Sequence, residues 1–262
     1  MIALEPEKVN INNYSLWLLL AEYAPITVIG IENPYQGWLV EDIEADAEKN
    51  IQLLKDQGLL LAFEDDHYEL LPDLRVAVDL IAKPRSILIA LDSSSGTMQE
   101  QTYYYLGEQE SVRLSRKSNE VQLERIANRP ILLDTLLNNL PLPLAPQPAT
   151  AFTLSEEVLF QASSLAVQAK YPETLNLLDG TNLTDSARNE LMQALENRQA
   201  NASFAILDNP SDLNNQRVTG FGIVAGGDRL WTLTPNNKPG RTQIDFSPTT
   251  PEELRRSLSS LL

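Results

Sequence analysis

The sequence predicts an α+β protein made of two related halves. The ending of the chain occurs twice, at residues 86–140 and again at residues 203–262. In each copy, short runs rich in Val, Ile, Leu and Tyr alternate with turn-forming residues, which predicts an antiparallel β-meander. Each copy then closes with an amphipathic helix that begins at a proline. The repetition predicts two similar sheets related by a pseudo-twofold axis.

The first half opens with elements that lie ahead of its meander. Residues 14–23 read as a short apolar helix closed before Pro25, and the β-branched residues 26–31 read as a strand. Between residues 39 and 54, apolar side chains recur at three- or four-residue steps and acidic ones fill the other positions, with Gly58 as the end signal. This pattern predicts a helix with one core face and one strongly acidic face.

A hairpin, a helix and the first meander follow. Residues 59–63 and 68–71 flank a polar tetrapeptide and predict a small hairpin, and residues 74–81 predict a helix that stops before Pro84. Four runs and a terminal helix are then matched between the copies. The runs are 87–92 with 204–208, 103–107 with 222–226, 112–114 with 231–233, and 121–124 with 242–245; the helices share Pro130, Leu133, Leu137 and Leu140 with Pro251, Leu254, Leu258 and Leu261.

The proline-rich residues 141–150 separate the copies. Alternating prolines favour extended geometry, so we expect an N-terminal half at 1–140, a linker at 141–150 and a C-terminal half at 151–262. Thr153 with Glu156 predicts a capped helix, followed by helices over residues 171–178 and 184–198. Residues 226–228 predict a tight hairpin turn, and Thr250 with Glu253 predicts a capping box.

Composition excludes several classes of function. The net charge of −16 disfavours binding to nucleic acid and to anionic lipid, and no apolar stretch approaches the ~18 residues needed to cross a bilayer. The absence of cysteine excludes disulfides, and the upstream residues lack the basic start of a signal peptide. We therefore expect a cytoplasmic, acidic protein without membrane insertion, whose oligomeric state the sequence leaves open.

The inventory of reactive side chains is poor. With one histidine and no cysteine, the chain lacks Cys-His dyads, histidine-rich metal triads and structural zinc sites. We expect no catalytic residues, no metal site and no cofactor. An enzyme that uses carboxylates alone, with magnesium near Asp65 and Asp66, remains an alternative; the neighbouring His67 sits in a polar loop without the spacing of a calcium site. A plain oligomerisation scaffold is a further alternative.

The connection at residues 92–101 is long and polar for a meander, where two to five residues are usual. Its counterpart at residues 209–216 is similarly polar. Such loops often carry binding residues, although nothing in this one resembles a nucleophile with an activating base. We treat it as a candidate binding loop.

The arrangement of the whole chain resembles the EspG family of type VII secretion-associated chaperones. The resemblance is carried by the strand at residues 26–31, the helix end at 54–58, the stretches 71–74 and 80–84, the strand at 86–91 and the closing helix that starts in 247–254. It implies two related α+β halves about a pseudo-twofold axis.

The resemblance also implies a function and a contact region. Members of the family bind the helical tip of a PPE protein within a PE–PPE heterodimer and keep it soluble for export, without covalent chemistry. The implied partner is a helical PE–PPE-like client, with further contacts from the helices of the second half. The implied contact residues lie in the loop after residue 92: Ser95, Gly96, Thr97, Met98, Gln99, Glu100 and Gln101.

Overall fold

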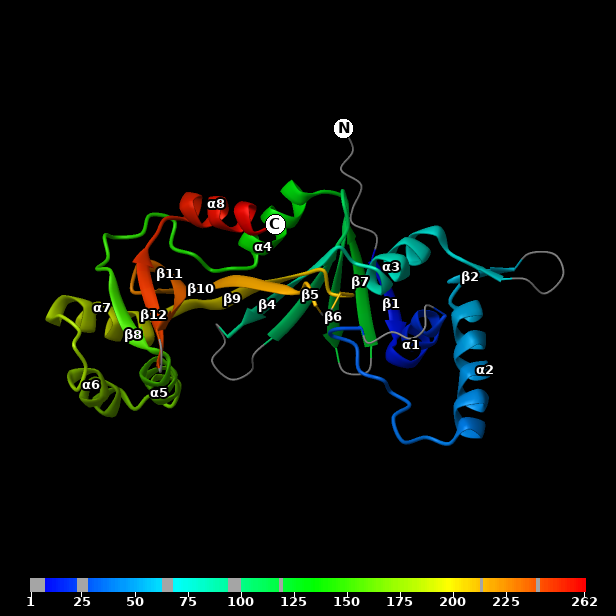
Figure 1. Ribbon diagram of the computed structural model, residues 1–262, viewed down its shortest axis with the longest axis horizontal. Coiled ribbons are helices and arrows are strands. Elements are labelled where there is room, and N and C mark those ends of the chain that lie inside the picture. Colours follow the sequence, from blue (N-terminus) through cyan, green and yellow to red (C-terminus); the bar gives the residue numbers. More distant parts are fainter. Residues whose placement is uncertain are drawn as a thin grey trace. The chain divides into compact units, whose positions relative to one another are not determined.

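The structure is a computed structural model that describes residues 8–22, 28–62, 68–93, 100–117, 120–212, 214–238 and 241–262 (Figure 1). The fold class predicted from the sequence is confirmed: helices pack with a large antiparallel sheet. In the described part of the chain, ten strands belong to this sheet and two form a separate small sheet.

The first half contains the following elements in chain order. They are β1 (Lys8–Asn12), α1 (Asn13–Ala21), α2 (Val40–Asp56), β2 (Leu60–Ala62), β3 (Tyr68–Leu70), α3 (Pro72–Ala82), β4 (Ser86–Asp92), β5 (Glu100–Leu106), β6 (Ser111–Lys117), β7 (Glu120–Ile126) and α4 (Arg129–Asn138). The expected small hairpin is β2 and β3, which pair antiparallel.

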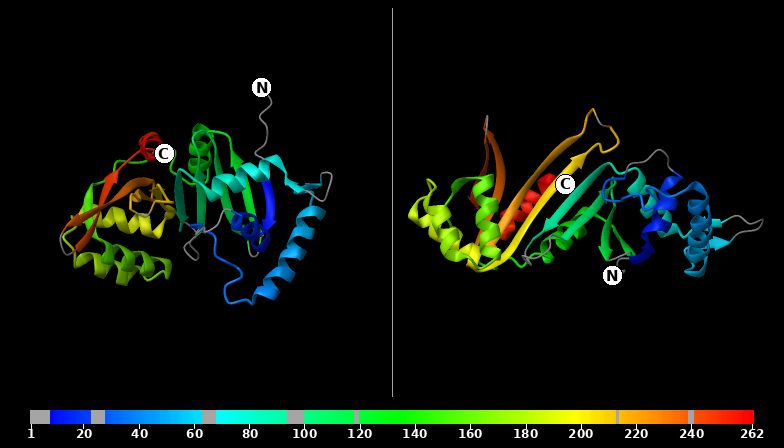
Figure 2. Two further views of the ribbon diagram at one scale, coloured as in Figure 1. Left: turned by 45° about the vertical axis from the view of Figure 1, so that its right-hand side comes forward. Right: turned by 90° about the horizontal axis from the view of Figure 1, so that it is seen from below.

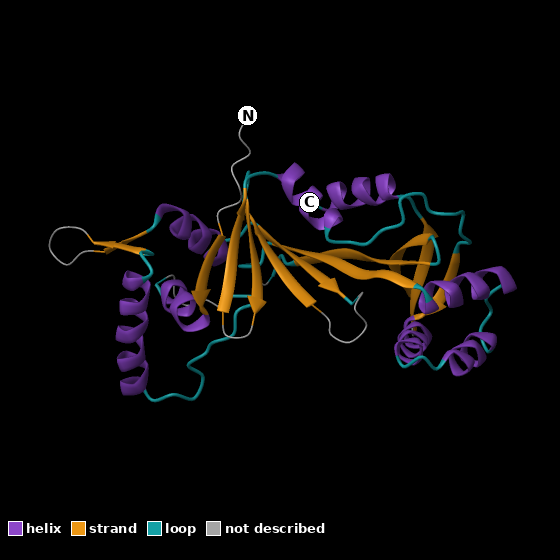
Figure 3. Ribbon diagram, turned by 180° about the vertical axis from the view of Figure 1, so that it is seen from behind, coloured by secondary structure: helices purple, strands orange, loops and turns teal. Residues whose placement is uncertain are grey.

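The second half repeats this order without the small hairpin. It contains β8 (Phe152–Ser155), α5 (Glu156–Val167), α6 (Tyr171–Asp179), α7 (Asp185–Glu196), β9 (Arg198–Asp208), β10 (Arg217–Gly226), β11 (Arg229–Lys238), β12 (Arg241–Pro248) and α8 (Pro251–Leu261). Figure 3 shows α5, α6 and α7 grouped beside the strands of this half.

The strand order repeats as well. In the first half it is β1-β7-β6-β5-β4, and in the second half it is β8-β12-β11-β10-β9. Each half therefore adds the strand that precedes its helices to the last strand of its meander. Because an early strand is placed at the same position in both series, the repeat of strand order extends beyond the ending of each half.

Register supports the match of the second and third runs. Tyr105 pairs with Val112 in the first half, and Val224 pairs with Trp231 in the second, as the matched runs require. The fourth run is shifted by two residues. Leu114 faces Leu123, whereas the equivalent Leu233 faces Phe246 and not Ile244. A shift of two residues keeps every side chain on its own face of the sheet. The alternation of apolar and polar residues is therefore the same in both registers, and the sequence pattern alone cannot distinguish them.

The internal contacts of the chain divide it into two compact units that differ from the halves of the repeat. One unit holds Met1–Leu88, Thr102–Leu132 and Leu207–Arg217; the other holds Ile89–Gln101, Leu133–Ile206 and Val218–Leu262. Strands β4 and β9 therefore each contribute residues to both units. The half boundaries at residues 140 and 151 stay a prediction.

The strand expected at residues 26–31 is wrong for its described part. Residues 28–31 form a turn in which Ile31 N donates to Val28 O at 3.1 Å. The carbonyls of this segment are bound by side chains of the meander: Tyr105 Oη donates to Ile29 O at 2.7 Å, and Arg116 donates to Gly30 O at 2.6 Å. The edge position in the sheet is taken instead by β1, which pairs with β7.

A second correction concerns the cap of α5. The helix begins at Glu156, and its N-cap is Ser155, whose side chain accepts a hydrogen bond from Val158 N at 3.3 Å. Thr153, the expected cap, lies in β8 and donates from Oγ1 to Asp245 across the sheet. Residues 152–155 form a strand that the sequence pattern did not predict, so the helix starts two residues later than expected.

The third correction concerns the apolar face of α2. The helix forms as expected, but of its apolar residues only Leu54 is fully buried, at 1% exposure. On its inner side, Asn50 Oδ1 accepts hydrogen bonds from Asn12 and Ser15 of the β1–α1 junction. A polar network therefore anchors the helix where an apolar contact was expected.

Candidate partner-binding surfaces

The loop predicted to bind a partner begins after β4. Ser95, Gly96, Thr97, Met98 and Gln99 lie outside the described residues. Glu100 and Gln101 form the first two residues of β5, and the side chain of Gln101 is exposed. These seven residues stay a predicted contact region. Asp65, Asp66 and His67, the alternative metal position, also lie outside the described residues.

The equivalent loop of the second half joins β9 to β10, which run side by side up to it (Figure 2). Asp212 organises this loop: its carboxylate accepts hydrogen bonds from Asn214 N at 3.1 Å and Asn215 Nδ2 at 2.7 Å. The hydrogen bond from the Asn215 side chain, followed by that from the Asn214 backbone, lowers the pKa of Asp212. Gln216 Nε2 donates to Pro210 O and closes the loop.

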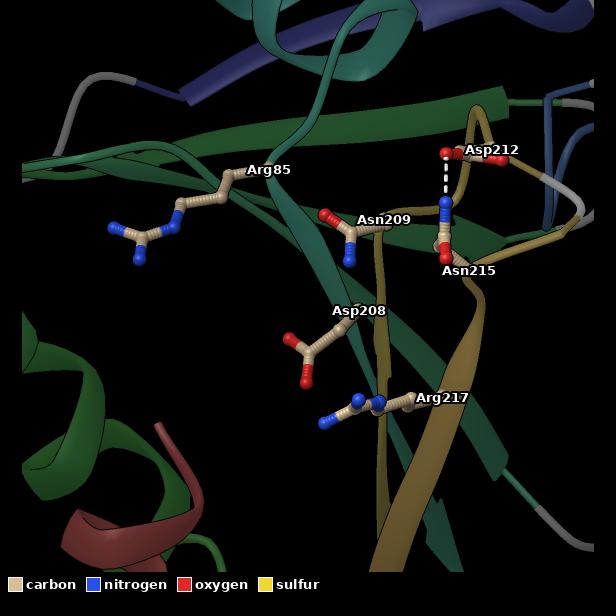
Figure 4. Close-up of a pocket in the computed structure, with 6 residues that line it drawn as sticks. All are labelled: Arg85, Asp208, Asn209, Asp212, Asn215 and Arg217. Atoms are coloured by element: carbon tan, nitrogen blue, oxygen red, sulfur yellow. Dashed lines mark hydrogen bonds between the residues drawn. The ribbon is translucent and has the colours of Figure 1, made fainter.

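This loop forms one side of an open pocket of about 620 Å³ (Figure 4). The side chains of Asp208 and Arg217 extend into the same region between the strands, while Asn215 points back to Asp212. The lining is wholly polar: Arg85, Asp208, Asn209, Asp212, Asn215 and Arg217. The lining combines two arginines with two aspartates and includes no nucleophile paired with an activating base, so the pocket suits polar recognition. The sequence predicted a polar loop at residues 209–216, but no sequence motif indicated that Arg85 and Arg217 would lie beside it.

No metal centre is found in the part of the chain that the structure describes. No three acidic, histidine or cysteine side chains lie close enough together there to hold an ion. Among the same residues, no helix combines the length and the hydropathy that a membrane span requires.

Exposed apolar side chains lie on α5 and α6 of the second half. Phe160 is 75% exposed and Val167 is 46% exposed, and their spacing of seven residues places them on one side of α5. Ala162 and Ala166 on the opposite side are buried in the core. Leu175 of the neighbouring α6 is also exposed. We call Phe160, Val167 and Leu175 the α5–α6 surface; sequence reasoning expected contacts from these helices without naming the residues.

A second apolar surface lies around α2 of the first half. Trp38, Leu39, Val40 and Ile51 are all exposed there, although the sequence pattern assigned the last three to the core. Apolar side chains that gather on an exposed helix face are typical of interaction sites. We call these four residues the α2 surface.

Comparison with known proteins identifies the fold. No family model matches the sequence, and no curated protein matches it. The structure is similar to that of EspG5, a chaperone of the Mycobacterium tuberculosis type VII secretion system, solved in complex with the PE25–PPE41 dimer. The likeness has a TM-score of 0.65 and covers 97% of this chain and 95% of that chain, at 12% sequence identity. The protein therefore has an EspG-like fold over almost its whole length.

Proposed function

We propose that the protein is a cytoplasmic secretion chaperone that binds a helical PE–PPE-like client and keeps it soluble for type VII export. The observation that carries the proposal is the length of the structural match. The likeness covers 97% of this chain and 95% of the matching chain, and the matching protein was solved with a PE–PPE dimer. A shared single subdomain would support much less.

The α5–α6 surface supplies what such a function needs. A chaperone that covers an apolar client needs exposed apolar side chains on an element that is held in place by the core. It also needs a polar surface around them, which prevents the complex from aggregating. Phe160 projects from a helix whose other side is fixed in the core by Ala162 and Ala166. The net charge of −16 keeps complexes of this chain apart. No step of this function requires a reactive side chain.

Co-expression tests the proposal. The protein is produced with PE–PPE-like pairs encoded nearby in the same genome, and a tag on the client is used to recover the complex. We expect the chaperone to co-purify. Replacing Thr97, Met98 and Gln99 by Ala should weaken capture without unfolding the chain, and unchanged capture would remove these residues from the contact region.

A second pair of variants maps the surface. Phe160→Ser with Val167→Ser should weaken capture because both side chains would lie against the client. Val40→Ser with Ile51→Ser on the α2 surface is the matched control, since it removes similar exposed apolar area in the other unit. Equal loss of capture in both double variants would contradict the assignment of the client to α5 and α6.

A further inference from the structure

The α2 surface is not accounted for by the proposed function. Val40 is 70% exposed and Ile51 is 42% exposed, eleven residues apart on α2. Eleven residues make three turns of an α-helix, so both side chains point in nearly the same direction over about 16 Å. Trp38 and Leu39, at 43% and 66% exposure, immediately precede Val40 and add exposed apolar side chains at the start of the helix. Figure 3 shows α2 beside α1, with its other side uncovered by the described chain.

Aromatic packing and hydrogen bonds fix the segment at the start of the strip. Trp38 packs against Tyr35 and Tyr14, with ring centroids 5.4 Å and 5.9 Å apart. Tyr35 Oη donates to Asp46 of α2 at 3.0 Å, which ties the preceding segment to the helix. Asn50 donates to the same carboxylate at 2.8 Å. Trp38 is therefore fixed before a partner arrives, and a side chain that is already fixed loses little freedom on binding.

Acidic side chains border one side of the strip. Glu44 and Glu48 are four and eight residues beyond Val40, which places them along one edge of the strip, and Glu41 lies further round. Lys55, four residues beyond Ile51, lies on the same edge, so the carboxylates outnumber the basic side chains there. The three glutamates are exposed, and in the described part of the chain none of them forms an ion pair with a basic side chain. An apolar strip bordered by carboxylates is complementary to an apolar stripe bordered by lysine or arginine.

The negative charge beside the α2 surface discriminates between the partners that could bind there. A second copy of this chain would bring the same carboxylates against each other, and the net charge of −16 adds to the repulsion. An anionic membrane surface would be repelled for the same reason. A straight strip of three turns matches the apolar face of another helix, because helices pack along such rows.

We propose that the α2 surface binds a basic amphipathic helix of a second protein, distinct from the client held by α5 and α6. This inference goes beyond the proposed function and does not depend on it. It assigns the chain two apolar binding surfaces, one in each compact unit, with different partners.

Two synthetic helices of about 18 residues test the proposal with the full chain. They share one leucine stripe, and one carries lysine and the other glutamate beside it. By fluorescence anisotropy, we expect the lysine peptide to bind and the glutamate peptide not to bind. Val40→Ser with Ile51→Ser should weaken binding at least about tenfold, while Phe160→Ser with Val167→Ser should leave it within about twofold.

A charge reversal gives a second readout that does not rely on removing apolar area. Glu44→Lys with Glu48→Lys should shift the preference toward the glutamate peptide. The proposal is wrong if the lysine peptide fails to bind, if the Val40 and Ile51 variant binds it as tightly as the wild type, or if both peptides bind equally. The proposal would also be wrong if sedimentation shows that the wild type is a dimer and the Val40→Ser, Ile51→Ser variant is a monomer, because the α2 surface would then bind a second copy of the chain. Client capture should survive the same variant, so failure here is separable from failure of the proposed function.

Discussion

Gly226 provides a sharp test of the packing between the second meander and its helices. This residue ends β10 where the strand passes the C-terminus of α7. A Cβ at this position would lie 2.7 Å from Asn197 O and 2.8 Å from the Ala194 Cα atom, and closer still to Ala194 O. These atoms belong to the backbone, so a flexible side chain cannot move aside to make room. Gly226→Ala must therefore push α7 away from the strand.

The magnitude follows from comparison with Gly222 in the same strand. A Cβ there would lie 3.4 Å from the Leu233 Cβ atom, an ordinary contact. We expect Gly226→Ala to lower the free energy of unfolding by about 1–3 kcal/mol, as overpacking does, and Gly222→Ala to stay within about 1 kcal/mol of wild type. A loss of 2 kcal/mol corresponds to about 4–8 °C in melting temperature for a chain of this size. Circular dichroism melts of both variants measure this. Equal melting temperatures would refute the close approach of β10 to α7.

Two further predictions concern hydrogen bonds that fix the second half. Glu190 accepts hydrogen bonds from Thr150 N at 2.7 Å and Ser186 Oγ at 2.7 Å. Desolvation raises the pKa of this carboxyl group, but its hydrogen bonds together outweigh that effect, so the net pKa is lowered. The carboxylate's contribution to the free energy of unfolding is present above the unfolded-state pKa of about 4.3 and is lost as the pH falls through the lower folded-state pKa. Lowering the pH should therefore destabilise the wild type more than the Glu190→Gln variant. At pH 7, Glu190→Gln should cost about 1–3 kcal/mol in urea unfolding, and no loss would refute the role of this carboxylate. Thr250 Oγ1 accepts from Glu253 N at 3.2 Å, so Thr250→Ala should cost about 1 kcal/mol, measured as a lower melting temperature, whereas Thr250→Ser should retain stability.

Local signals in the sequence were sufficient where a feature depends on neighbouring residues. The capping box of α8 forms with both of its hydrogen bonds, from Glu253 N and from Thr250 N. The turn after β10 also forms as expected: Gly227 and Asp228 both have positive φ, and Gly226 pairs with Arg229 around them. Two positive φ values in a two-residue loop are the signature of a type I′ turn, which glycine and aspartate favour.

Features that depend on contacts between residues far apart in the chain could not be predicted from the sequence. Residues 28–31 have a strand-like composition, yet the Tyr103 ring stacks over Gly30, which has φ +89°, leaving no room for a side chain there. Lys8–Asn12 forms β1 although only Val9 and Ile11 alternate in it, because pairing with β7 and burial of Ile11 decide its conformation. Tertiary context overrides propensity in both segments.

Periodicity also could not separate core faces from interaction surfaces. Val40 and Ile51 continue the same stripe as the buried Leu54, and Phe160 resembles any core phenylalanine in the sequence. Exposed and buried apolar residues follow the same helical spacing, so only the fold distinguishes them. The resemblance in arrangement correctly predicted the EspG-like fold, whereas the apolar side chains of the α5–α6 surface became visible only in the structure.

The solubility of the client tests the central proposal most directly. A PE–PPE-like pair is expressed alone and with this protein, and the fraction of client that stays in the supernatant after centrifugation is compared. We expect the client to precipitate alone, to remain soluble with the protein, and to migrate with it on size-exclusion chromatography. A client that is equally soluble without the protein, and migrates separately from it, would rule out the proposed chaperone function.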